Sequence, residues 1–369
     1  MEIDAVVVRE RNGPPRVERL SLSGPGMGEV LVRVLASGVC HSDLHYQAGA
    51  LGDDFPYLLG HEGAGVVEAV GPGVRAPAEG DYVALTYRAP CGECRFCRSG
   101  LLHHCARPAA AATQPEDGSG TVLTRALDLG THATHLIVAA GQAVPIPREC
   151  PPEVACLLGC GVSTGVGAVL NTARVRPGSS VVVFGIGGVG ANVILGARLA
   201  RASLIIAVDV AGQKLEWAKR LGATHTMSAG DSVAAQIRDL TGGDGVGYAF
   251  DAVGLPATLS QSVESLEYRG TAVLIGLPPA NAALTVPMLP YFFNGSSLRV
   301  CLGGDVLPSR DLPLLARWYL NGELALDSLV SRCIGLAGLE DAFRAMIEGE
   351  VLRSVVRLPG EWPSRPPSR

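Results

Sequence analysis

The sequence predicts an α/β protein of two domains, in which a β-rich part precedes a doubly wound parallel sheet. At 369 residues the chain is longer than one hydrophobic core usually supports, so two domains are expected. Over the first 150 residues short β-type runs alternate with glycine- and proline-rich turns, which predicts an irregular, mostly antiparallel sheet. From about Pro177 such runs alternate with helical stretches, the βαβ pattern of an open parallel sheet.

The individual elements follow from local patterns. In the first part, apolar runs between turns such as GPG and PP predict strands over residues 29–34, 65–70, 82–86 and 135–138. In the second part we expect strands over residues 180–184, 204–209, 248–251 and 272–275. The alanine- and turn-rich residues 106–121 are expected to form a surface excursion, and the tail from Pro359 is expected to be disordered.

Composition argues against several classes of partner. The chain is 47% hydrophobic and 18% charged, and its net charge of −5 gives no reason to expect nucleic acid or an anionic membrane as partner. We expect no signal peptide, because the first residues contain no continuous apolar core, and no membrane span, because no long window is free of charge and turn residues. Ten cysteines without a secretion signal are expected to be reduced thiols and metal ligands in the cytoplasm.

Four closely spaced cysteines indicate a structural metal site. They are Cys91, Cys94, Cys97 and Cys105. Zn²⁺ takes four thiolates in a closed tetrahedron, and paired CxxC units without a secretion signal favour zinc over disulfides. His103 or His104 in the same loop could replace one thiolate, although four cysteines are the preferred set. Such a closed site stabilises a fold but leaves no position for chemistry.

A glycine-rich turn indicates a dinucleotide site. Gly185, Gly187 and Gly190 form GxGxxG between an apolar strand and a helix, which permits a tight turn and a close approach of the backbone to a pyrophosphate. Asp209 ends the next strand, 19 residues beyond Gly190, where a carboxylate binds ribose hydroxyls and disfavours a 2′-phosphate. NAD is therefore expected rather than NADP. Lys214 is either a ribose contact or an ordinary lysine of the first helical turn.

Three further ligand candidates stand far apart in the sequence. Cys40 lies in GVCHSDLH, His61 in GHEGAG and Cys160 in GCGVSTG. Singly each suits a core position, but together they form a Cys₂His set, which leaves a fourth position open on Zn²⁺. Zinc in such a site acts as a Lewis acid that lowers the pKa of a bound water or alcohol.

These motifs, in this order, resemble those of the zinc-dependent medium-chain alcohol dehydrogenases, over about residues 5–358. The resemblance implies a GroES-like β-rich catalytic domain of residues 1–161 and 302–369, with the structural zinc lobe at about 88–106. It implies a Rossmann NAD-binding domain of residues 162–301 between these parts. The chain is similar to the two-zinc branch of the family, including class III-like and bacterial long-chain members, which implies a homodimer.

The resemblance also implies roles for single residues. Cys40, His61 and Cys160 match the ligands of the catalytic zinc. Glu62 matches a group that can approach the metal, and Asp43 matches a carboxylate that orients the histidine ligand. Ser42 and His45 match two steps of a proton relay. Further cofactor contacts are implied at His41, Thr164, Gly188, Val189 and Arg353, with Arg353 facing the pyrophosphate.

The expected reaction is the reversible, NAD-dependent oxidation of a primary alcohol to the aldehyde, because zinc activates the hydroxyl and NAD accepts the hydride. The resemblance implies pocket-lining positions at Leu51, Tyr87, Thr134 and Leu277, any of which could instead be a core or surface residue. Relatives often carry a bulky aromatic residue at the position of Thr134, so this residue implies room for a bulky or aromatic alcohol. One alternative is a mycothiol-type, thiol-adduct formaldehyde dehydrogenase or S-nitrosothiol reductase. Arg107 stands near the position where glutathione-dependent relatives carry an arginine. A second alternative is a non-catalytic member of the family, although such a protein would have no need of the open metal site and Ser42.

Overall fold

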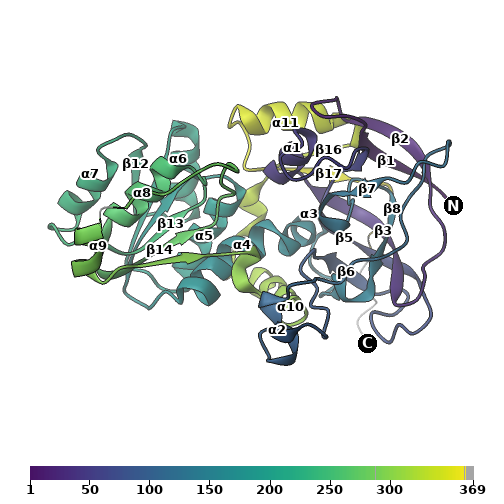
Figure 1. Ribbon diagram of the computed structural model, residues 1–369, viewed down its shortest axis with the longest axis horizontal. Coiled ribbons are helices and arrows are strands. Elements are labelled where there is room, and N and C mark those ends of the chain that lie inside the picture. The colour runs from purple at the N-terminus through teal and green to yellow at the C-terminus, as the bar shows by residue number, and fades with distance from the viewer. Residues whose placement is uncertain (287, 361, 363–369) are drawn as a thin grey trace. The chain divides into compact units, whose positions relative to one another are not determined.

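The protein is described here by a computed structural model that covers residues 1–286, 288–360 and 362 (Figure 1). It contains two compact units, one of residues 1–160 and 307–369 and the other of residues 161–306. The first boundary thus lies one residue before the expected one, and the second lies five residues after it.

The first unit is built on two β-sheets. The larger has the order β16-β17-β3-β5-β6-β9, with β8 also paired to β3, and the smaller has the order β2-β1-β4-β7. Their strands are β1 (Glu2–Val8), β2 (Arg16–Ser21), β3 (Glu29–Gly38), β4 (Tyr57–Leu58), β5 (Glu62–Val70), β6 (Tyr82–Leu85), β7 (Thr124–Arg125), β8 (His135–Ala139), β9 (Ala143–Pro145), β16 (Val330–Ile334) and β17 (Arg353–Arg357). Most pairs are antiparallel, as predicted; β4/β7 and β16/β17 are parallel. In Figure 1 the yellow C-terminal strands join the purple N-terminal ones within this unit.

The first unit also contains five α-helices among its described residues. They are α1 (His41–Gln47), α2 (Arg95–Arg98), α3 (Pro152–Ala155), α10 (Pro308–Leu320) and α11 (Leu339–Ile347). Helix α11 buries Leu339, Ala342, Phe343 and Met346, which recur at the spacing of one helical face, in the main core of this unit. Strand β17 follows α11 and pairs with β3, so the C-terminal segment completes the sheet that the N-terminal strands begin.

The second unit is a six-stranded, fully parallel sheet flanked by helices (Figure 1). Its strands are β10 (Ser180–Phe184), β11 (Leu204–Asp209), β12 (His225–Ser228), β13 (Val246–Asp251), β14 (Leu266–Leu274) and β15 (Ser297–Val300). The helices are α4 (Gly161–Gly167), α5 (Gly188–Leu199), α6 (Gly212–Leu221), α7 (Val233–Leu240), α8 (Pro256–Glu264) and α9 (Met288–Asn294). The order β12-β11-β10-β13-β14-β15 reverses between β10 and β13, which is the Rossmann order and confirms the predicted fold class.

Residues 106–121 form an excursion held to the first unit by side chains. The Glu29 carboxylate accepts hydrogen bonds from the amides of Ala112 and Thr113 and from the Thr113 hydroxyl, and Arg9 pairs with Asp117. The disorder predicted for the tail from Pro359 falls mainly on residues 361 and 363–369, which lie outside the described residues. Among the described helices, no single one is long and apolar enough to cross a membrane; one bent pair, Pro152–Gly159 with Gly161–Ala173, passes by length and composition alone.

Candidate active site and metal centres

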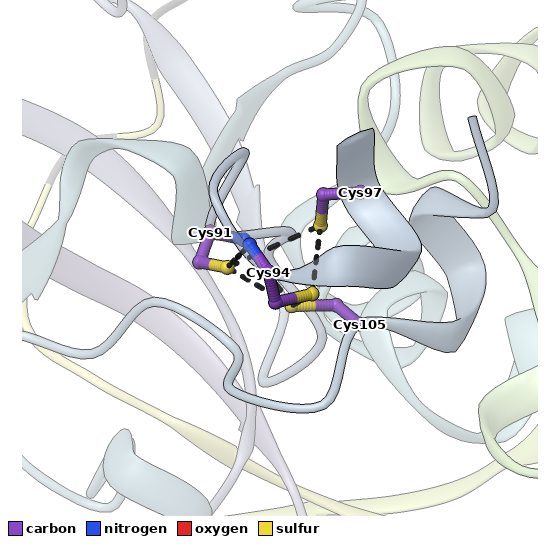
Figure 2. A group of neighbouring side chains, drawn as sticks. All are labelled: Cys91, Cys94, Cys97 and Cys105. Carbon is purple, nitrogen blue, oxygen red and sulfur yellow. Dashed lines mark hydrogen bonds between the residues drawn. The ribbon is translucent and has the colours of Figure 1, made fainter. Parts of the chain in front are cut away.

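The four-cysteine segment folds into a closed cluster of thiols (Figure 2). Neighbouring sulfur atoms lie 3.5 Å apart for Cys94–Cys97 and for Cys91–Cys105, 3.9 Å for Cys94–Cys105 and 4.0 Å for Cys91–Cys97. A tetrahedron of thiolates about 2.3 Å from zinc has edges of about 3.8 Å, whereas a disulfide needs about 2.05 Å. The four sulfur atoms therefore fit a zinc ion and exclude a disulfide in this arrangement.

The backbone of the lobe prepares these thiols for metal. The amides of Cys91 and Cys94 point at the sulfurs of Cys105 and Cys91, at 3.3 and 3.4 Å. Hydrogen bonds from the backbone of Cys97 and Ala106 lower the pKa of Cys94 to about 6, which favours the thiolate that zinc requires. The rings of His103 and His104 lie 4.2 Å apart and are tilted by 47° in the short turn Leu102–His104, and among the described residues the compact metal-binding group of the lobe consists of the four cysteines.

A second group of metal-binding side chains lies in the same unit, fully buried. The ligand atoms of Cys40, His61, Glu62 and Cys160 all lie within 4.8 Å of one another. The structure thus brings together the three predicted ligands from segments about 20 and 100 residues apart, and adds the carboxylate of Glu62.

Local backbone features place each ligand. Cys40 is the residue before α1, and His61 precedes β5. Gly60 has a φ of +94°, and a side chain there would meet the backbone of His132. Cys160 follows Gly159, whose added Cβ would lie 1.7 Å from the carbonyl oxygen of Leu85, so only glycine lets this segment approach β6.

The donor set fits zinc. Neither ring nitrogen of His61 has a hydrogen-bond partner among the described residues, although the side chain is fully buried, and a metal ion would satisfy it. Nδ1 of His61 faces Asp43, which leaves Nε2 for the metal. A hydrogen bond with Cys160 lowers the pKa of the Cys40 thiol well below its usual range, and the same contact raises that of Cys160. One thiolate is therefore already favoured before metal binds.

Asp43 occupies the position predicted for an orienting carboxylate. Its Oδ1 lies 3.4 Å from Nδ1 of His61, and its Oδ2 lies 3.6 Å from Nε2 of His132. Burial alone would raise the pKa of Asp43, but the two imidazoles outweigh burial and hold that pKa well below its usual range. An ionised acceptor beside a histidine ligand fixes the tautomer and the ring orientation that the metal needs.

Arg353 lies in the first unit against Glu62. Its guanidinium is 3.2 Å from a Glu62 oxygen and donates a hydrogen bond to the carbonyl oxygen of Val39, and it is only 4% exposed. The family resemblance implied a contact of Arg353 with the cofactor pyrophosphate and did not imply this buried ion pair. Burial raises the pKa of Glu62 to about 7, against the opposing charge of Arg353.

The two relay candidates lie on α1. The Oγ atom of Ser42 is 3.9 Å from the sulfur of Cys40, and both Ser42 and His45 are partly exposed. The hydroxyl is thus next to a metal ligand and reachable from solvent. The ring of Tyr87 packs edge-on against His61 at 6.4 Å, next to the same ligand.

The other predicted pocket residues have additional or different contacts. The Thr134 hydroxyl accepts a hydrogen bond from the Asp4 amide, Leu51 packs on the main core of the first unit, and Leu277 lies in the second unit, about half exposed. Arg107 is exposed.

In the second unit the glycine-rich turn connects β10 to α5 at the point where the strand order reverses. Gly187 precedes α5, and nothing lies within 4 Å of a Cβ added there, whereas a Cβ on Gly190 would lie 1.9 Å from the Gly185 carbonyl oxygen. Asp209 ends β11, where its oxygens accept hydrogen bonds from the amides of Ile186 and Ala211. Asp209 thus stabilises the glycine-rich turn through these hydrogen bonds. NAD fits this site, because the backbone at Gly187 is not covered by side chains and a carboxylate lies at the end of the adjacent strand.

The remaining cofactor candidates are distributed over both units. Gly188 and Val189 begin α5, Lys214 lies in the first turn of α6, and Thr164 lies in α4, all in the second unit. His41 begins α1 in the first unit.

His132 and its partners are the residues of this site that sequence reasoning missed. His132 is fully buried and lies 89 residues beyond Asp43, in a segment (GTHATH) without any metal-binding spacing. A histidine beside a small-residue turn was the only signal, and that signal is common in ordinary cores.

Comparison with known proteins identifies the family. Residues 26–148 match the family described as Alcohol dehydrogenase GroES-like domain, and residues 188–321 match Zinc-binding dehydrogenase. An S-(hydroxymethyl)glutathione dehydrogenase from Aspergillus oryzae is 36% identical over 93% of this chain and 92% of its own. The crystal structure of an alcohol dehydrogenase zinc-binding domain protein from Burkholderia ambifaria is 37% identical, covers 98% of this chain and 100% of its own, and has a TM-score of 0.92. Benzyl alcohol dehydrogenase from Acinetobacter calcoaceticus is 30% identical, covers 97% of this chain and 100% of its own, and has a TM-score of 0.90. The Aspergillus relative exceeds 30% identity over most of both chains, and both groups of side chains that could hold zinc are present, so the chain belongs to the NAD-dependent zinc medium-chain alcohol dehydrogenases.

Proposed function

We propose that this enzyme interconverts a primary alcohol, including bulky or aromatic ones, and the corresponding aldehyde. The observation that carries the proposal is the buried Cys40–His61–Cys160 group with the Ser42 hydroxyl 3.9 Å from the Cys40 sulfur. Three protein ligands leave one position for a substrate oxygen, and a hydroxyl beside them suits proton transfer.

Each part of the chain contributes a separate task. Bound zinc would supply a Lewis acid that lowers the pKa of an alcohol, and NAD would supply the hydride acceptor. Cys40, His61 and Cys160 hold the metal, and Asp43 orients His61. Ser42 takes the proton of the alcohol and His45 passes it to solvent, for which their partial exposure on α1 is suitable. Glu62, balanced by Arg353, keeps a further carboxylate within reach of the metal.

The thiol-adduct reaction is the second candidate, because a relative over most of the chain is named for it. Such a substrate needs a cationic anchor for the carrier thiol, and the candidate is Arg107, which is exposed and follows the last lobe cysteine in the sequence. The benzyl alcohol dehydrogenase that resembles the chain in structure favours the first candidate. A non-catalytic role has no support from the site, since it would not require the open ligand set.

A substrate screen separates these candidates. NADH formation is measured with primary alcohols of increasing size, benzyl alcohol included, and with formaldehyde in the presence and absence of glutathione or mycothiol. The proposal predicts turnover of benzyl and larger alcohols without any thiol. Turnover only with formaldehyde and a thiol would contradict it and favour the second candidate, and Arg107→Ala would then raise the KM for the adduct.

We further propose that the enzyme is a homodimer that uses the outer edge of the second unit. Strand β15 is the last strand of that sheet, and its residues are exposed. Helix α9 next to it exposes Met288, Leu289, Phe292 and Phe293, each at least 68%. Several exposed large apolar side chains in one helix, together with an open strand edge in the same unit, are typical of an association surface. Sedimentation of wild type and of Phe292→Glu tests this, and a wild-type monomer would contradict it.

The cysteines suit a cytoplasmic location, which is the expectation drawn from their number in the sequence. All ten cysteines are free thiols, and eight of them belong to buried positions. A reducing compartment keeps such thiols available for zinc.

A further inference from the structure

Asp43 lies between two imidazoles, and only one of them belongs to a metal ligand. Each carboxylate oxygen accepts one backbone amide hydrogen bond of 3.0 Å, from Gly60 at Oδ1 and from Cys40 at Oδ2. Each oxygen also faces one imidazole nitrogen, His61 Nδ1 at 3.4 Å and His132 Nε2 at 3.6 Å. The carboxylate is 0% exposed, so these four groups form its immediate surroundings. His132 thus faces Oδ2 in the same way that the predicted ligand His61 faces Oδ1.

The far side of His132 determines where its proton resides. Nδ1 lies 2.8 Å from the Ser37 hydroxyl, and the Ser37 oxygen lies 2.7 Å from the Thr131 hydroxyl. If Thr131 donates to Ser37 and Ser37 donates to Nδ1, the proton of a neutral His132 remains on Nε2, facing Asp43. This arrangement turns the Nε2–H group, rather than a lone pair, toward the Asp43 carboxylate 3.6 Å away.

The backbone around His132 holds the ring in place. Its amide donates to the Leu59 carbonyl at 3.0 Å, and its carbonyl accepts from the Val6 amide at 2.8 Å. A Cβ on Gly60 would lie 2.4 Å from the His132 amide nitrogen and 2.8 Å from its Cγ. The turn that presents His61 therefore packs directly against His132, with no room for a side chain between them.

We propose that His132 is a positioning residue of the catalytic zinc site, which acts through Asp43. With its Nε2 directed at Oδ2 from 3.6 Å, it holds the carboxylate in the orientation in which Oδ1 faces Nδ1 of His61. Without His132, the Cys40 amide is left as the donor that faces Oδ2, so less holds the carboxylate in its orientation toward the ligand. Ser37 supports this by fixing the tautomer. The proposal rests on the proposed zinc-dependent function of the same site.

The test measures zinc affinity, which does not depend on knowing the substrate. Zinc release from the full-length protein to a chelator is followed by native mass spectrometry for each variant. The lobe at Cys91, Cys94, Cys97 and Cys105 serves as an internal reference, and Cys160→Ser identifies which release belongs to the open site. His132→Phe should weaken the open site about 10-fold, the lower end of the effect of losing an outer-shell partner, and leave the lobe unchanged. His132→Gln retains a side-chain N–H donor and should recover most of that loss.

A double-mutant cycle separates positioning from general stability. In an Asp43→Asn background, His132→Phe should produce no further loss of zinc affinity, because the carboxylate through which it acts is gone. Equal zinc affinity of wild type and His132→Phe would overturn the proposal, and so would an undiminished effect in the Asp43→Asn background. Should His132→Phe fail to fold, Ser37→Ala decides instead: because the tautomer of His132 is freed while its ring remains, a loss smaller than the about 10-fold of His132→Phe is expected, and unchanged affinity overturns the proposal. Zinc-loaded wild type that oxidises no alcohol would contradict the proposed function while leaving this comparison intact.

Discussion

Replacing Gly190 with alanine should destabilise the NAD-binding unit, because the methyl group of the alanine would overlap a backbone atom. The added Cβ would lie 1.9 Å from the carbonyl oxygen of Gly185. Gly185 has little freedom to move away, since it has a φ of +84° and already packs against Val253. Overpacking that a flexible side chain can relieve costs about 1–3 kcal/mol, and this contact with backbone is expected at the upper end, about 3 kcal/mol.

The expected change is large enough to measure by thermal unfolding. For a domain of this size a destabilisation of about 1 kcal/mol lowers Tm by about 2–4 °C, so Gly190→Ala should lower it by about 6–12 °C. The measurement is circular dichroism on heating, with NADH binding followed by fluorescence at a temperature where both proteins are folded.

Gly187→Ala is the matched control in the same turn. Nothing lies within 4 Å of its added Cβ and its φ of −93° suits any residue, so Tm should be unchanged. NADH affinity should nevertheless fall, because a methyl group there would meet the pyrophosphate that the bare backbone approaches. A Gly190→Ala protein with wild-type Tm, or a Gly187→Ala protein with wild-type NADH affinity, would refute this reasoning.

Three further predictions concern the first unit. Glu29→Gln replaces one of the two acceptor oxygens with an amino group, so the Gly26 amide and the Thr113 hydroxyl, which share Oε2, lose their charged acceptor, and the free energy of unfolding in urea at pH 7 should fall by about 2 kcal/mol. Burial opposes the shift, but the hydrogen bonds to Glu29 lower its pKa. The contribution of Glu29 to stability is therefore present above the unfolded pKa of about 4.3 and is lost as pH falls through the folded pKa. An equal stability difference between wild type and Glu29→Gln at pH 3 and pH 7 would contradict this. Cys94→Ala should lower Tm and the zinc content, while the surviving folded protein still forms NADH; loss of all turnover at full occupancy of the open site would show that the lobe does more than support the fold. His41→Arg should slow NADH dissociation in stopped-flow fluorescence several-fold, because a permanent cation binds phosphate more tightly than a neutral imidazole, and an unchanged rate would argue against a phosphate contact.

Features written into short stretches of sequence could be predicted. The lobe cysteines lie within fifteen residues, and the glycine turn lies between a strand and a helix, so local geometry alone brings their atoms together. Cys40, His61 and Cys160 could be grouped because together they form a Cys₂His ligand set suited to a catalytic zinc ion. Their spacing in the sequence gives no indication that they meet.

Long-range side-chain contacts could not be predicted. The pairing of Arg353 with Glu62 joins β17 to the start of β5, and it depends on how the C-terminal strand inserts beside β3. His132 reaches Asp43 only because the turn at Gly60 lacks a side chain. The residue pattern around either position is that of an ordinary core, so only the folded chain reveals these partners.

The central claim is that the Cys40–His61–Cys160 group is the zinc site of an alcohol dehydrogenase. The most direct measurement is zinc content and NADH formation from benzyl alcohol on the same samples of wild type and Cys160→Ala. The account predicts that Cys160→Ala keeps the lobe zinc, loses the other zinc and forms no NADH. A folded Cys160→Ala protein that forms NADH at the wild-type rate would contradict it.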